Sequence, residues 1–239
     1  MTDPGMRSKI ILAFDADDTL WVNEPIYSNA ENEFSEIVKP YLVQENAGDL
    51  LYKTEMENLR SFGYGIKGFI LSMIETAIDI SKGLVTADEI ERIILMGKEM
   101  IHHPVEVLDG VKESLNELSN QYGLMMITKG DLFDQESKIA RSGLHFYFSE
   151  IEIVSEKNEK TYSDLLQKHK IAQERFIMVG NSVKSDILPV CAIGAQAIHI
   201  PFHTTWKHEE VTAGTSDPIG YYQLKDIRQL PEFLESLLL

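Results

Sequence analysis

Five short apolar segments recur along the chain and predict the strands of a buried sheet. The first runs from Ile10 to Phe14 and ends abruptly at Asp15. The other four lie at residues 124–127, 151–154, 176–179 and 195–200. A continuous apolar run of this length is typical of a strand that is covered on both faces, as in a parallel sheet.

Helical patterns lie between most of these runs. Their apolar positions are Val111, Leu115 and Leu118, then Tyr162, Leu165 and Leu166, and finally Leu230, Phe233, Leu234, Leu237 and Leu238. Strands that alternate with helices favour an α/β fold. We therefore predict a doubly wound, mainly parallel, Rossmann-like sheet.

The interval between the first and second strands breaks this rhythm. It contains no strand pattern, and its apolar residues follow helical stripes at residues 27–41, at residues 66–78 and from residue 90 onward. The middle stripe repeats the i, i+3, i+4 spacing of an amphipathic helix throughout. The sequence therefore predicts an α/β core domain with an inserted all-helical domain, the core comprising residues 1–22 and 105–239 and the insertion residues 23–104.

Composition limits the class of protein and its partners. The 239 residues are 44% hydrophobic and 25% charged, which is ordinary for a globular chain. The net charge of −16 disfavours binding to nucleic acid polymers and to anionic membranes. The single cysteine excludes an internal disulfide, and the apolar runs are far shorter than the roughly 20 residues of a membrane span. We expect a cytoplasmic protein, and the oligomeric state stays open.

Polar residues follow the predicted strands at the edge where open parallel sheets bind ligands. In chain order they are Asp15 and Asp17 after the first strand, Thr128 at the end of the second, Lys157 after the third, and Asp186 one helical turn beyond the fourth. Carboxylates, a hydroxyl and an ammonium group are therefore expected to converge on one edge.

The chemistry of this set points to phosphoryl transfer. Neighbouring carboxylates cannot all stay ionised without a cation, and Mg²⁺ is the hard, oxygen-seeking ion that suits them. Lys157 and the backbone N–H groups around Gly130 could hold a dianionic group opposite the metal. Asp15 could then attack phosphorus in line, while Asp17 donates a proton to the leaving group. This arrangement predicts an aspartyl-phosphate intermediate.

Four segments, in order, resemble the motifs of the haloacid dehalogenase-like (HAD) hydrolase superfamily. They are Phe14–Leu20 (FDADDTL), Ile127–Gly130 (ITKG), a lysine at position 157 or 160, and Val179–Ile187 (VGNSVKSDI). Leu108–Val111 is similar to the segment that follows the helical cap of these enzymes. The motifs extend over nearly the whole chain, and the first and fourth are fairly specific.

The resemblance implies a role for each motif residue. Asp15 is expected to be the nucleophile, Asp17 the general acid and base, and Thr128 a phosphate ligand through its hydroxyl. Lys157 is expected to neutralise the phosphate, and Mg²⁺ to be bound by Asp15, Asp186 and the backbone carbonyl of Asp17. The helical insertion would be the cap that closes over the site and excludes water.

Asp17 separates two activities within the superfamily, because the dehalogenases lack this second aspartate and the phosphatases use it to protonate the departing alkoxide. The resemblance therefore implies a Mg²⁺-dependent phosphomonoesterase that acts on a small cytoplasmic phosphate ester of the nucleotide or sugar phosphate class.

Three points stay open. A phosphomutase would share the aspartyl-phosphate, and a degenerate binding or regulatory protein would keep only the scaffold. Asn181, where the superfamily usually has aspartate, motivates the second alternative, although with Asp186 kept we expect activity with weaker metal affinity. Lys160 is the alternative to Lys157, whose spacing from the preceding strand and from Tyr162 fits the third motif better.

Overall fold

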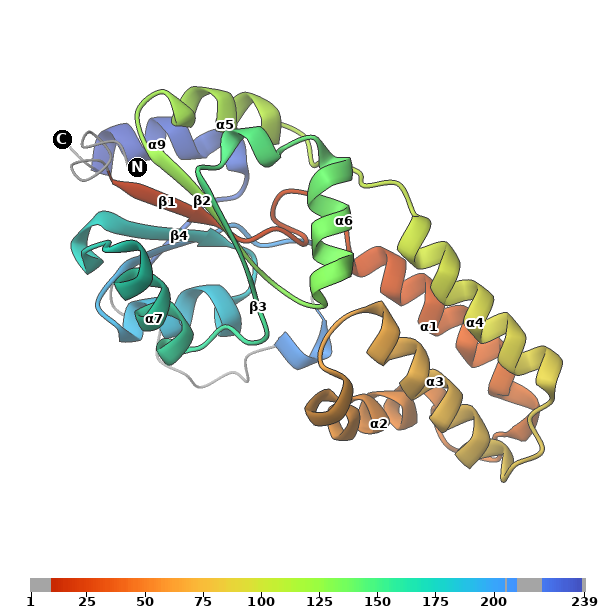
Figure 1. Ribbon diagram of the computed structural model, residues 1–239. Coiled ribbons are helices and arrows are strands. Elements are labelled where there is room, and N and C mark those ends of the chain that lie inside the picture. Colours follow the sequence, from red (N-terminus) through yellow and green to blue (C-terminus); the bar gives the residue numbers. More distant parts are fainter. Residues whose placement is uncertain (1–9, 205, 210–220, 238–239) are drawn as a thin grey trace. The chain divides into compact units, whose positions relative to one another are not determined.

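The computed structural model describes residues 10–204, 206–209 and 221–237; the remaining residues of the predicted core domain lie outside these ranges. The chain divides into two units (Figure 1). The first comprises Met1–Glu24, Val105–Lys129 and Lys138–Leu239, and the second comprises Pro25–Pro104 together with Gly130–Ser137.

The first unit contains a six-stranded sheet in which every neighbouring pair is parallel. Its strands, in spatial order, are β3 (Glu150–Val154), β2 (Gly123–Lys129), β1 (Ile11–Phe14), β4 (Phe176–Gly180), β5 (Gln196–His199) and β6 (Tyr221–Gln223). The predicted parallel α/β fold is confirmed, and five strands coincide with the five apolar runs. The sequence analysis missed β6, because its three residues form no apolar run and none is buried.

The helices of the first unit are α5 (Val111–Ser119), α7 (Glu159–His169), α8 (Leu188–Ala192) and α9 (Leu230–Leu237), with η5 (Val183–Ile187) as a π-helical turn after β4. Figure 1 shows α5 and α9 on one face of the sheet and α7 on the other. The helix α6 (Leu132–Ser142) has residues in both units.

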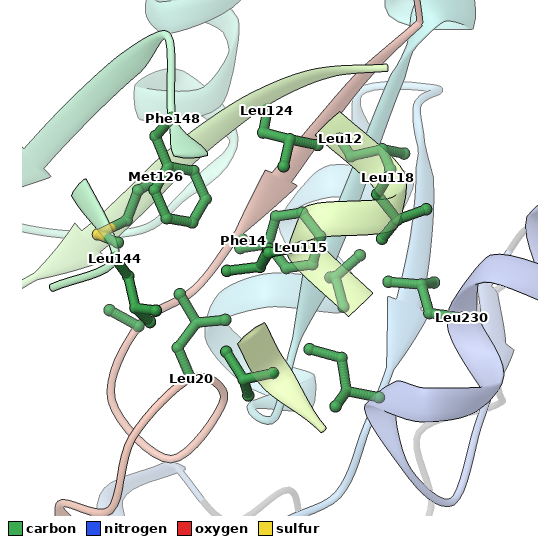
Figure 2. Close-up of a cluster of buried hydrophobic side chains, with 14 of the residues drawn as sticks. Leu12, Phe14, Leu20, Leu115, Leu118, Leu124, Met126, Leu144, Phe148 and Leu230 are labelled. Carbon is green, nitrogen blue, oxygen red and sulfur yellow. The ribbon is translucent and has the colours of Figure 1, made fainter. Parts of the chain in front are cut away.

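Alternate residues of β1 supply two separate cores. Leu12 and Phe14 pack in a cluster that includes Leu115 of α5 and Leu230 of α9 (Figure 2). Ile11 and Ala13 belong to a second cluster on the opposite face, with Tyr162, Leu165 and Leu166 of α7. A strand covered on both faces must be apolar at every position, which explains the unbroken run before Asp15.

The second unit contains α1 (Glu24–Val38) apart from its first residue, α2 (Ala47–Phe62), α3 (Ile66–Ser81) and α4 (Ala87–His102). These helices share one apolar core, to which α3 contributes Phe69 and Met73. The helix α4 begins at a capping box, in which the side chains of Thr86 and Glu89 accept each other's backbone N–H groups. The helix α2 was not predicted, since among its larger apolar side chains only Leu51 is fully buried.

Pro25–Pro104, the larger part of the second unit, is an insertion between β1 and β2, and no strand interrupts these described residues. The longest helices that the structure describes have 16 residues, and none combines the length and apolar character needed to cross a membrane.

Candidate active site

Asp15 follows β1 in the centre of the sheet. Its backbone N–H donates to the carbonyl of Val179 at 2.9 Å, which continues the β1–β4 pairing one residue beyond the strand. On the other side of β1, Phe14 pairs with Met126 of β2. The carboxyl ends of β1, β2 and β4 therefore meet at one edge, where the first and fourth motifs begin and the second motif ends.

One buried ammonium group joins the first and fourth motifs. Lys157 Nζ lies 2.5 Å from Asp15 Oδ1 and 2.7 Å from Asp186 Oδ1. The side chains of Lys157, Asp15 and Asp186 are 2%, 10% and 1% exposed. In contrast, Lys160 pairs with Asp164 on the surface, where its side chain is 83% exposed. The structure thus places Lys157, and not Lys160, beside Asp15.

Burial and charge act against each other in this cluster. The pKa of Asp15 is raised to about 7, because burial and the carboxylate of Asp186 raise it by more than the ammonium of Lys157 lowers it. Burial also opposes the charged form of Lys157, but the two carboxylates hold its pKa well above the ordinary value. Two carboxylates thus share a single ammonium in a region from which water is largely excluded.

A threonine and an asparagine complete the surroundings of Asp15. The hydroxyl of Thr19 lies 3.0 Å from Asp15 Oδ2 and 3.3 Å from Asn181 Oδ1, so it can donate to either oxygen. It also accepts the backbone N–H of Asn181 at 3.1 Å. Asn181 is the residue that departs from the usual fourth motif. The hydroxyl of Thr19 therefore links its side chain to the carboxylate of Asp15.

The turn after β4 fixes Asp186. Its Oδ2 accepts the backbone N–H of Ser182 at 3.0 Å, and the backbone N–H of Asp186 donates to the carbonyl of Ser182 at 2.8 Å. The hydroxyl of Ser182 also accepts the N–H of Ser185 at 3.0 Å. These bonds form the first turn of η5, and they direct Asp186 back toward Lys157.

Thr128 presents a buried hydroxyl near the end of β2. The residue is 1% exposed, and its Oγ1 has no hydrogen-bond partner among the described residues. A buried hydroxyl without a partner costs about 1–3 kcal/mol. An oxygen of a bound ligand at this edge would satisfy it.

Asp17 forms an ion pair with a second lysine, Lys138. Lys138 Nζ lies 2.8 Å from Asp17 Oδ1 and 2.9 Å from Asp17 Oδ2. The indole N–H of Trp21 donates to Oδ1 at 2.6 Å. Sequence reasoning missed Lys138, because a lysine on an amphipathic helix is ordinarily a surface residue, whereas Lys138 is only 9% exposed.

The neighbouring Asp18 serves the entry to the insertion. Its carboxylate accepts the backbone N–H groups of Asn23 and Glu24, where α1 begins. The pKa of Asp18 is raised to about 7, because the effect of burial outweighs the opposing effect of these two N–H groups. Two carboxylates of one motif thus have different surroundings.

Lys129, which follows Thr128, belongs to a second network. Its Nζ lies 2.6 Å from Glu209 Oε1 and 3.2 Å from the Ser185 hydroxyl. Glu209 Oε2 accepts hydrogen bonds from the hydroxyls of Ser182 and Ser185. Burial opposes ionisation of Glu209, but Lys129 and the two serines outweigh it and lower the pKa to about 2. Glu209 was not predicted, since it ends the short 3₁₀ turn η6 (Lys207–Glu209), where the sequence has no apolar periodicity.

The donor set suits a magnesium ion. Among the residues that the structure describes, no three or more His, Cys, Asp and Glu side chains are grouped to hold a metal. Mg²⁺ does not require such a cage, since proteins usually bind it through one or two carboxylates, with water and substrate phosphate supplying the other oxygens. The buried pair Asp15 and Asp186, which has one shared ammonium for two negative charges, fits that requirement.

Comparison with known proteins identifies relatives of this chain. A crystal structure of a haloacid dehalogenase-like family hydrolase from Xanthomonas campestris is 38% identical, covers 99% of this chain and 94% of that one, and superposes with a TM-score of 0.85. The N-acylneuraminate-9-phosphatase of Mus musculus is 27% identical over 135 residues, which are 54% of this chain and 52% of that protein. The glyceraldehyde 3-phosphate phosphatase of Methanothermobacter thermautotrophicus is 31% identical over 126 residues, which are 48% and 53% of the two chains.

The match thus spans about half the length of these two phosphatases. The model of the haloacid dehalogenase-like hydrolase family matches residues 11–190, which include β1 to β4 and the helical insertion between β1 and β2. With a family match over most of its length and a helical insertion at the position of the cap, this chain belongs to the haloacid dehalogenase-like hydrolases.

Proposed function

We propose that this protein is a Mg²⁺-dependent phosphomonoesterase that forms an aspartyl-phosphate on Asp15. The observation that carries the proposal is the shared contact of Lys157 with Asp15 and Asp186, at 2.5 and 2.7 Å. It brings the carboxylate of Asp15, a buried cation and a second carboxylate to one point at the end of β1. Asp17, two residues beyond Asp15, supplies the group that exchanges protons.

In the first step a carboxylate oxygen of Asp15 forms a bond to phosphorus. The bond between phosphorus and the ester oxygen breaks, and the electron pair of that oxygen takes the proton of the Asp17 carboxyl group. The products are the free alcohol and phosphorylated Asp15. Lys157 balances the charge of the phosphoryl oxygens, and the Thr128 hydroxyl donates to one of them.

In the second step a water molecule attacks phosphorus. The Asp17 carboxylate takes a proton from that water while the bond between phosphorus and the Asp15 oxygen breaks. Inorganic phosphate leaves, the Asp15 carboxylate is restored, and Asp17 is again protonated for the next cycle. The net reaction consumes one phosphate ester and one water.

The residues that would hold Mg²⁺ are Asp15, Asp186 and the backbone carbonyl of Asp17. When bound, the ion would supply positive charge next to the transferred group. Asn181 contributes an amide oxygen where aspartate is usual, which removes one negative charge from this region. We therefore propose a metal affinity that is lower than an aspartate at this position would give.

The substrate is proposed to be a small phosphate ester of the nucleotide or sugar phosphate class. The two relatives named as phosphatases support the sugar phosphate class, since their names refer to phosphates of an acylneuraminate and of glyceraldehyde. The net charge of −16 supports a small metabolite over a nucleic acid polymer. In this proposal residues 23–104 act as a cap domain, and residues 1–22 and 105–239 form the catalytic core.

The test is release of inorganic phosphate from a panel of small phosphate esters, with Mg²⁺ and with EDTA. We expect turnover that requires Mg²⁺ and disappears in Asp15→Asn. Asp164→Asn is the matched control, because Asp164 is an exposed aspartate whose partner, Lys160, lies on the surface of the same helix. Folded wild-type protein without turnover on any ester would reject the phosphatase, and a requirement for a bisphosphate would favour a phosphomutase.

A further inference from the structure

Lys138 is a buried cation that none of the four motifs contains. It lies on α6, is 9% exposed, and is 121 residues from Asp17 in the sequence. Its Nζ lies within 2.9 Å of both carboxylate oxygens of Asp17 and 3.1 Å from the side-chain oxygen of Asn23. The ammonium therefore bridges the first motif and the residue just before α1.

The contacts around Asp17 determine its orientation. An aspartate side chain turns about two bonds, and a proton donor in catalysis must present one oxygen at a defined position. Here Lys138 binds both oxygens, while the Trp21 indole N–H binds Oδ1 at 2.6 Å. Three contacts from two donor side chains therefore restrain the orientation of the Asp17 carboxylate.

Anchoring of the helix does not account for this lysine. The next residue, Ile139, is 6% exposed and packs in the same core as Leu12 and Phe14, so α6 already has an apolar anchor. A buried ion pair is a weak source of stability, because an apolar side chain of similar volume often serves as well. The gain from Lys138 must then lie in what it does to Asp17.

We propose that Lys138 is a positioning residue that aims the Asp17 carboxyl group at the leaving-group oxygen of the phosphate ester. The inference rests on the proposed function and deepens it. Lys138 does not touch the substrate. It acts through Asp17, and the indole N–H of Trp21 assists it.

This role predicts a defect that depends on the leaving group. An alkoxide needs a proton as the bond to phosphorus breaks, whereas 2,4-dinitrophenolate is stable enough to leave without one. A variant that misplaces Asp17 should therefore fail on alkyl phosphates and retain activity on 2,4-dinitrophenyl phosphate. A general loss of structure would reduce both rates by the same factor.

The experiment measures kcat/KM of Lys138→Met for 2,4-dinitrophenyl phosphate and for the best alkyl phosphate of the panel. This constant reports the steps through phosphoryl transfer to Asp15. We expect a loss of about 10- to 100-fold on the alkyl phosphate, part of the ~10²–10⁴-fold that proton transfer supplies, and of less than about threefold on the dinitrophenyl ester. The ratio of the two constants is independent of the folded fraction, so partial misfolding cannot mimic the result.

Further variants give the measured ratio a scale. Asp17→Asn should give the largest change in the ratio. Trp21→Phe removes one hydrogen-bond donor but keeps an aromatic ring, so it should change the ratio in the same direction but by less. Lys168→Met is the control, because Lys168 pairs with Glu152 at 2.6 Å on the surface. Its ratio should equal that of the wild type. Lys138→Gln repeats the test with a second side chain if the methionine variant does not accumulate.

The inference is overturned if Lys138→Met leaves the ratio unchanged, whether both constants fall together or neither falls. Failure of the proposed function has a different signature, since the wild type would then hydrolyse neither ester, and both proposals would be withdrawn. A change in the ratio for Lys138→Met and Asp17→Asn, with no change for Lys168→Met, would establish the positioning role.

Discussion

Gly180, the last residue of β4, lies against the side chain of Asp186. A Cβ atom at position 180 would stand 2.2 Å from Asp186 Oδ2 and 2.6 Å from Asp186 Cβ, distances that real atoms do not adopt. The glycine is required here by this close approach, and not by an unusual backbone angle. The position of Asp186 beside Lys157 therefore depends on the absence of a side chain at residue 180.

We predict that Gly180→Ala destabilises the protein by about 1–3 kcal/mol, the usual cost of overpacking. Because the carboxylate of Asp186 must move, turnover should fall by about 100-fold, as for a misplacement of about 1 Å. Urea unfolding and phosphate release measure the two effects. In an Asp186→Gly background the same alanine should cost much less stability, and an equal cost in both backgrounds would show that Asp186 is not the obstacle.

The buried hydroxyl of Thr128 leads to an uncommon combination of effects. Thr128→Val should leave the free energy of unfolding unchanged or raise it by up to about 1 kcal/mol, because it replaces an unpartnered polar group by an apolar one of the same shape. The apparent affinity for phosphate esters should fall at least tenfold, on the order of one charge-assisted hydrogen bond. Thermal denaturation and steady-state kinetics report these two quantities.

Thr76→Val is the matched control for that substitution. Thr76 is also buried, but its hydroxyl donates to the carbonyl of Ser72 at 2.7 Å within α3. Thr76→Val removes this hydrogen bond, so it should lower the free energy of unfolding by about 1 kcal/mol and leave turnover unaltered. Destabilisation by Thr128→Val of the same size would mean that the Thr128 hydroxyl has a structural partner.

Lys157 and Lys160 should behave very differently when each is replaced by methionine. Lys157→Met leaves Asp15 and Asp186 buried without their common cation, so we expect a loss of about 3–5 kcal/mol and no turnover. Lys160→Met removes an exposed pair with Asp164 and should change stability by less than about 0.5 kcal/mol. Chemical denaturation measures the stability of the two variants, and phosphate release measures their turnover. Equal losses in Lys157→Met and Lys160→Met would contradict the placement of Lys157 at the centre of the site.

Glu209 should make stability depend on pH in the acid range. Its pKa is lowered from 4.5 to about 2, so its contribution is fully present above about pH 4.5 and is lost as the pH falls toward 2. Glu209→Gln should therefore be less stable than the wild type by about 1–3 kcal/mol at pH 7, and the difference should shrink steadily below pH 4.5. Urea unfolding between pH 7 and pH 3 measures that trend.

Lys129→Met removes the strongest attraction on the Glu209 carboxylate. It should therefore reduce the change in stability that Glu209 causes below pH 4.5. A difference between wild type and Glu209→Gln that stays constant from pH 7 to pH 3 would exclude the network of Lys129, Ser182 and Ser185 as its cause.

The sequence predicted most clearly what a buried strand requires. A strand covered on both faces has to be apolar at every position, so β1 stands out as a run and Asp15 as its end. The edge strand β6 and the sparsely apolar helix α2 lack such a signal. Each is held by tertiary packing that a local pattern does not contain.

Two contacts of the candidate site could not be predicted from the sequence, because each joins residues that are far apart in the chain. Lys138 meets Asp17 across 121 residues of sequence, and Lys129 meets Glu209 across 80. Nothing near Lys138 or Glu209 distinguishes it from a surface residue of the same type. Only the fold decides which of the many charged side chains face the ends of β1 and β2.

The place of the insertion has a consequence for the way the chain folds. The pairing of β1 with β2 closes a loop of about a hundred residues, and a flexible loop of that length carries a substantial closure entropy. The helices of the insertion form their core from residues 26–101 alone, so that their contacts are local in sequence and fast to establish. A helical unit that is formed first would shorten the effective loop, and the slow, long-range step would then be the arrival of β4 beside β1. During synthesis the proposed nucleophile Asp15 emerges before the insertion, whereas Lys157 and Asp186, whose charges lie beside it, emerge only after the insertion.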